Sequence, residues 1–185
     1  MAPEKLFEKL NYLKAYRKNR LEAAHWVLSN PKCLPALLEF CFKNDGDINF
    51  KAAWVLEFVC IDKIQLLLPH LDYFFENLPR VTHESALRSL AKICELLTIR
   101  CYKNKDTLVI NSLNESHKNI MTECSFDWLI TNKKVACQAH AMLSLYYLGN
   151  EIKWIHPELK VILQQHIHHQ SAGYKARAKN ILKHL

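Results

Sequence analysis

The stretch that decides the fold runs from Leu34 to Cys60 and begins with the segment Leu34-Pro35-Ala36-Leu37. A polar turn, Asn44-Asp45-Gly46-Asp47, follows, and the apolar segment behind the turn carries Ala52-Ala53. Proline is tolerated in the first turn of a helix, and small residues let a following helix pack closely. This stretch therefore predicts two helices joined by a short turn.

The same arrangement recurs twice along the chain. Leu68-Pro69-His70-Leu71 precedes Ala86 by the same proline-to-alanine offset, and His156-Pro157-Glu158-Leu159 precedes Ala176 by an offset two residues longer. The region 118–149 lacks the proline. A recurring helical hairpin predicts an α-solenoid, which is a surface for binding rather than a ready-made catalytic pocket. The alternative is that the three prolines are unrelated first-turn or kink-forming prolines.

These repeats resemble the HEAT family, in which a proline lies in the first helix and small residues lie in the second. The resemblance covers nearly the whole chain and implies an all-α, right-handed α-α superhelix of the HEAT or armadillo kind. Such motifs specify a fold and leave the activity open.

Composition agrees with a helical globular protein. The chain has 185 residues, of which 50% are hydrophobic and 23% charged, and it contains three glycines. So few glycines disfavour turn-rich β-sandwiches and barrels. We expect a single helical-repeat domain over residues 1–185 with about five helical hairpins, and an irregular insertion near residues 100–114, where the apolar pattern lapses.

The cysteines and the apolar pattern indicate a compartment. Seven cysteines without a Cys-x-x-Cys pair, most at apolar helix positions, predict reduced core thiols. The first residues lack the pattern of a secretory signal, and no apolar run approaches the roughly 18 residues that span a bilayer. We therefore expect a cytoplasmic protein that does not bind membranes.

Local signals mark several helix ends. Asn30-Pro31 is typical of an N-cap followed by a first-turn proline, and Ser171 is a suitable N-cap for the last helix. Gly149 suits the left-handed position after a helix C-terminus. We expect helices to begin or end at these residues.

The second helices of the hairpins carry the candidate binding residues. Trp54 and Glu57 lie one turn apart, the repeat offset aligns Arg88 with Trp54, and Lys92 follows Arg88 on the same face. The last helix adds three further cations, Lys175, Arg177 and Lys179. A positive face with an aromatic side chain suits phosphates and stacked bases. The net charge of +7 is compatible with a nucleic acid partner, but it adds only slight support for the hypothesis of nucleic acid binding.

This plan is similar to the DNA alkylation repair glycosylases, which are built from HEAT-like helix pairs. The resemblance implies a concave face, made by the second helices, that holds duplex DNA beside tryptophans and one acidic residue. No residue here matches the catalytic acid of that family by motif, so none is transferred.

Each candidate also has a purely structural interpretation. Trp54 packs at the boundary between repeats, Glu57 pairs with Lys51 or Arg88, and the basic last helix keeps a terminal repeat polar. These interpretations carry at least as much weight as DNA binding.

A further resemblance concerns residues 51–60 and 67–73, which look like a family of short bacterial proteins. Some members of that family are named adenylosuccinate lyases. The chain is far too short for the lyase fold, and it lacks the Ser-Ser-rich mobile loop with Met-Pro and Lys. We do not expect lyase activity.

The sequence carries no enzyme signature. His166 and His169 are three residues apart, but no third metal ligand is placed by the sequence, and histidines are favoured at a helix C-terminus anyway. A Gly-x-Ser-x-Gly elbow is missing, and three glycines cannot form a phosphate-binding loop. We expect no catalytic residues, no metal and no cofactor.

The sequence thus favours a non-enzymatic, monomeric scaffold whose concave face binds a protein or peptide. The rival hypothesis is a DNA-binding protein related to alkylation repair glycosylases.

Overall fold

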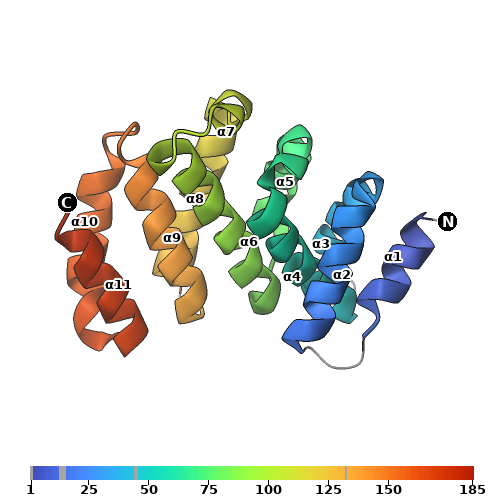
Figure 1. Cartoon of the computed structure of the whole chain (residues 1–185). Helices are drawn as coiled ribbons and strands as arrows, with labels where there is room; N and C mark the ends of the chain where they lie inside the picture. Colours follow the sequence, from blue (N-terminus) through green and yellow to red (C-terminus); the bar gives the residue numbers. More distant parts are fainter. Residues whose placement is uncertain (1, 13–15, 44–45, 132) are drawn as a thin grey trace. The chain divides into compact units, whose positions relative to one another are not determined.

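The computed structural model describes residues 2–12, 16–43, 46–131 and 133–185, and within these ranges it is all-α (Figure 1). The predicted fold class is confirmed. The described residues form eleven α-helices and no strand, and the helices are α1 (Ala2–Leu10), α2 (Arg17–Ser29), α3 (Leu34–Phe42), α4 (Gly46–Lys63), α5 (Leu71–Asn77), α6 (Glu84–Thr98), α7 (Thr107–Ser112), α8 (Glu115–Ile130), α9 (Val135–Leu148), α10 (Ile155–His166) and α11 (Ala172–Leu182).

The chain divides into two compact units, Met1–Ile93 and Cys94–Leu185. The first unit holds α1 to α5 and most of α6, and the second holds the end of α6 and α7 to α11. A single domain across residues 1–185 and the handedness of a superhelix stay predictions.

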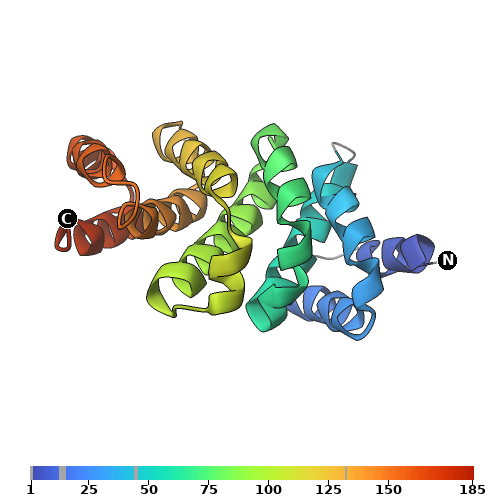
Figure 2. The ribbon, with the colours of Figure 1, turned by 90° about the horizontal axis from the view of Figure 1, so that it is seen from above.

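In the first unit, helices pack in pairs around α4, which contacts both α2 and α3. Pro35 lies in the first turn of α3, where its missing N–H costs nothing. Ala52 and Ala53 are fully buried, as is Ala86 in α6. Figures 1 and 2 show α2 and α4 running beside each other. The proline helix and the small-residue helix predicted from this stretch are therefore confirmed.

In the second unit, α9 is the central helix and contacts α8, α10 and α11. The core contains Trp128 of α8, Met142 of α9, Leu163 of α10 and Tyr174 of α11, all buried. Ala176, which the repeat pattern aligned with the buried alanines, is exposed. The proline-to-alanine pattern thus marks buried alanines in the first unit. At its last occurrence, in the second unit, the aligned alanine is exposed.

The segment near residues 100–114 is mostly helical, so the expected irregular insertion is wrong. A π-helical turn, Ile99–Lys103, extends α6. The next helix, α7, is capped by Asp106, whose side chain accepts a hydrogen bond from Leu108 N–H. The apolar pattern lapses there because the exposed residues Leu108 and Ile110 alternate with buried Val109 in a short helix.

The predicted helix boundaries at Asn30, Gly149 and Ser171 are confirmed, but the local conformation differs at the first two: a 3-10 turn begins at Pro31 directly after Asn30 and leads into α3, and α9 ends just before Gly149. The Asn30 side chain donates to Trp26 O at the end of α2 instead of capping the next helix. Gly149 has a right-handed backbone (φ −63°), and glycine is required because a Cβ there would overlap the ring of His156. Ser171 caps α11 by accepting a hydrogen bond from Tyr174 N–H.

In the ranges that the structure describes, none of the helices is both long and apolar enough to cross a bilayer.

Replacing Leu56 by alanine tests the packing of α4. Leu56 is fully buried, so Leu56→Ala should lower the free energy of unfolding by about 2–5 kcal/mol through lost burial and a residual cavity. Ile61→Ala on the same helix is the control, because Ile61 is 46% exposed. Urea unfolding measures both. Equal effects of the two changes would contradict the assigned buried face.

The thiols should be unreactive in the folded protein. All seven cysteines are free and buried, and burial raises the pKa of Cys60, Cys94 and Cys33 and raises that of Cys124 to about 12. A thiol with a raised pKa holds little of the nucleophilic thiolate at neutral pH. Iodoacetamide should therefore label them slowly in buffer and fully in guanidinium chloride, as mass spectrometry would show. Rapid labelling without denaturant would contradict the buried assignment.

Candidate binding surface

Helix α4 presents one narrow stripe of aromatic side chains on the surface of the first unit. Phe50, Trp54 and Phe58 are half-buried, and they are spaced four residues apart. Because residues four apart lie on the same side of an α-helix, the three rings form one row. The residues between them are buried, including Ala52, Ala53, Val55 and Leu56.

Two arginines of α2 lie over this row. The Arg20 guanidinium carbon is 4.7 Å from the ring centroid of Trp54, and that of Arg17 is 5.3 Å from the centroid of Phe58. Both distances are typical of cation–π contacts. We call these five residues, Arg17, Arg20, Phe50, Trp54 and Phe58, the arginine–aromatic face.

The ring of Phe50 is also engaged within the molecule. It meets Trp54 edge-on, with centroids 4.8 Å apart, and stacks on His83 at 4.7 Å. Trp54 is thus contacted by Arg20 on one side and by Phe50 on another. The structural interpretation of Trp54 as a packing residue is supported, and a tryptophan held this way is a poor platform for a stacked base.

Glu57 is buried and links α4 to α6. Its Oε2 accepts hydrogen bonds from Arg88 Nη2, at 2.7 Å, and from the hydroxyl of Ser89. The predicted pairing of Glu57 with Arg88 is confirmed, whereas Lys51 donates elsewhere, to Tyr12 O. The repeat offset that aligned α4 with α6 therefore located a real contact, made by Glu57 rather than by Trp54.

This ion pair reduces the positive charge that α4 and α6 present. We expected a continuous positive groove to favour nucleic acid and an interrupting acidic residue to favour a protein partner. Arg88 is neutralised by Glu57, and Lys92, one turn further along α6, is half-buried. The acidic side chain lies among the cations, so the first unit does not offer an unbroken row of positive charge.

The three cations of α11 do not share one side of the helix in the second unit. Lys175 and Lys179 are four residues apart on one side, whereas Arg177 lies about 200° around the helix from Lys175. Arg177 lines a groove of about 670 Å³ between α9 and α11, whose other lining residues are mainly small: Val135, Ala136, Ala139, Gly173, Ala176 and Asn180. The role of these cations in binding stays a prediction.

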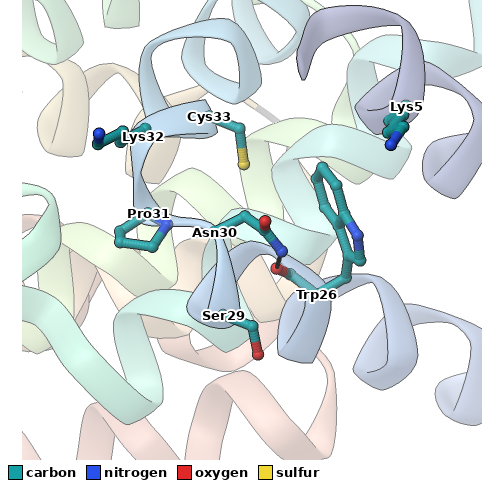
Figure 3. A pocket seen from close by; sticks show the side chains of 7 residues that line it. All are labelled: Lys5, Trp26, Ser29, Asn30, Pro31, Lys32 and Cys33. Carbon is teal, nitrogen blue, oxygen red and sulfur yellow. Dashed lines mark hydrogen bonds between the residues drawn. The ribbon is translucent and has the colours of Figure 1, made fainter. Parts of the chain in front are cut away.

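A separate hollow lies at the end of α2 (Figure 3), with a volume of about 600 Å³. Trp26 and Cys33 face it, and Lys5 and Lys32 stand at opposite sides. The Cys33 thiol is buried and its pKa is raised by desolvation, so it lacks the activation that a nucleophilic cysteine needs. The hollow is thus lined by α1, α2 and the turn Pro31–Cys33, and its cysteine supplies no nucleophile.

The histidines give no metal site in the described ranges. His166 and His169 both line a small hollow of about 260 Å³ with Gln138 and Gln165, but no group of three or more His, Cys, Asp or Glu side chains there is arranged to hold an ion. His140 instead contacts the buried carboxylate of Glu95 through Nδ1.

Sequence reasoning found Trp54, Glu57 and Arg88 but missed most of the arginine–aromatic face. The four-residue spacing of Phe50, Trp54 and Phe58 is visible in the sequence and could have identified the row. The two arginines could not be assigned to it, because their contacts depend on how α2 packs against α4.

The comparisons with known proteins agree with this architecture. The profile of the HEAT repeat domain matches residues 11–185. No curated protein matches the chain, and no solved structure does. Because the matched region covers nearly the whole chain and the described residues are all-α, the chain belongs to the HEAT repeat family.

Proposed function

We propose that this chain is a non-enzymatic, monomeric scaffold in the cytoplasm that binds a protein or peptide through the concave face of its helical repeats. HEAT repeats present extended surfaces to binding partners, which supports the general role. The observation that carries the proposal is the arginine–aromatic face, because aromatic and arginine side chains are enriched at protein interfaces.

The geometry of that face favours a protein over DNA. Binding of single strands or displaced bases uses free aromatic faces, whereas Trp54 is contacted by Arg20 and Phe50, and Phe50 stacks on His83. Duplex binding uses many unneutralised cations, whereas Arg88 is neutralised by buried Glu57.

DNA binding is the second candidate, and the net charge of +7 together with the basic helix α11 supports it. Under this alternative, Lys175, Arg177 and Lys179 would contact phosphates. Affinity for duplex DNA would then fall steeply with added salt.

Site-specific photo-crosslinking in the native cell tests the proposal. Phe58 is replaced by p-benzoylphenylalanine in the full chain, and Tyr73 of α5, which is 40% exposed and outside the arginine–aromatic face, is replaced in the control. We expect protease-sensitive crosslinked species from position 58 and few from position 73. Equal crosslinking at both positions, or products removed by nuclease, would contradict protein binding at this face.

A further inference from the structure

Two buried polar atoms beside the arginine–aromatic face lack hydrogen-bond partners in the described part of the chain. They are the hydroxyl of Tyr12, just beyond α1, and Nε of Arg20 in α2. A buried donor without a partner destabilises a fold because it loses its hydrogen bonds to water, so such atoms in a native fold call for an explanation.

These two atoms belong to one cluster. The charge of Arg20 acts on Tyr12, and the Lys51 ammonium lies 5.2 Å from the centroid of the Tyr12 ring while donating to Tyr12 O at 2.9 Å. Lys51 lies in α4 one turn before Trp54, and the Arg20 guanidinium lies over the Trp54 ring. Tyr12, Arg20 and Lys51 therefore converge from three segments at one end of the arginine–aromatic face.

The cluster offers donors and positive charge. Burial raises the pKa of Tyr12 to about 12, so its hydroxyl stays protonated at neutral pH, and a guanidinium has no acceptor atom. In the described ranges, no ion pair joins Arg17, Arg20 or Lys51 to an acidic side chain. The group that would satisfy the cluster is an acceptor with negative charge.

We propose that the terminal Nη groups of Arg20, beside Tyr12 and Lys51, anchor a carboxylate of an acidic peptide segment in a partner protein, while Arg20 Nε and the Tyr12 hydroxyl stay buried within the fold. This inference rests on the proposed function and names the chemistry of the partner. The N–H groups of a guanidinium lie in the plane of the guanidinium itself, so the two Nη groups of Arg20 can donate two parallel hydrogen bonds to a planar carboxylate while its carbon lies over the Trp54 ring. Apolar residues flanking the carboxylate pack along the row formed by Phe50, Trp54 and Phe58.

A peptide is favoured over a nucleic acid here for two reasons. Arg20 covers part of the Trp54 ring and His83 stacks on Phe50, so less ring surface is left for a stacked base. The cluster also holds few cations, which suits one or two carboxylates better than a run of phosphates.

Fluorescence anisotropy with the full chain tests this proposal. The probe is a fluorescein-labelled peptide of alternating aspartate and leucine, compared with its asparagine isostere and with labelled single-stranded and duplex DNA. We expect the aspartate peptide to bind most tightly. Arg20→Gln should weaken it about ten-fold or more, the loss expected for a charge-assisted hydrogen bond.

Lys18→Gln is the matched control. It removes the same charge from the same helix, but Lys18 is 83% exposed and pairs with Glu22 away from the cluster. We expect at most a small change in affinity. If Arg20→Gln lowers the melting temperature, Arg17→Gln serves as the test instead, because Arg17 is at a more exposed position of the face. Arg17→Gln should weaken binding of the aspartate peptide more than Lys18→Gln does.

Three results would overturn the inference: equal weakening by Lys18→Gln and the two arginine variants, equal binding of the asparagine isostere, or tighter binding of either DNA. The proposed function is judged separately by the crosslinking at position 58. Position-specific protein crosslinks without acidic-peptide binding would refute the partner chemistry alone, and loss of the crosslinks would refute the scaffold role itself.

Discussion

The burial of α4 is the constraint on which the first unit depends. This helix is packed by α2 and α3, and its residues Ala52, Ala53, Val55 and Leu56 are fully buried. Small side chains permit close approach of the neighbouring helices, and larger apolar ones fill the space between them. Because neighbouring residues cover most of α4, one narrow stripe of its surface stays partly exposed. The side chains of that stripe are Phe50, Trp54 and Phe58.

The contacts around this stripe show how packing prepares a surface. Arg17 and Arg20 reach it from α2, and Glu57 extends from α4 to hold Arg88 and Ser89 of α6. Both arginines thus contact aromatic rings within the chain. An arginine that is ordered in advance loses less entropy when it binds a ligand. The same contacts cover part of the ring surface that base stacking would use.

The sequence was sufficient for the fold class and for part of the candidate site. An early Pro35, a polar turn and paired alanines predicted the α3–α4 hairpin, since each of these features acts through local geometry. The repeat offset even located the link between α4 and α6. It named Trp54 as the residue opposite Arg88, whereas the contact is made by Glu57, three residues later.

What escaped prediction depends on contacts between residues distant in sequence. Gly149 was expected to be left-handed, but it is glycine because the ring of His156 occupies the place of a Cβ. Asn30 was expected to cap the helical segment that begins at Pro31, but its side chain donates instead to Trp26 O of the preceding helix. The unpartnered hydroxyl of Tyr12 and Nε of Arg20 are visible only after α1, α2 and α4 have packed.

The central claim is that Arg20 is held ready for a negatively charged acceptor on a partner protein. The most direct measurement is the side-chain Nε–H nuclear magnetic resonance signal of Arg20 in the labelled full chain during titration with the aspartate–leucine peptide. The Nε–H signal of Arg100, which is already paired with Asp106 at 3.5 Å, serves as the internal reference. The account predicts that the Arg20 signal shifts and exchanges more slowly with water while the Arg100 signal stays in place. An unmoved Arg20 signal at a peptide concentration that shifts other residues would contradict it.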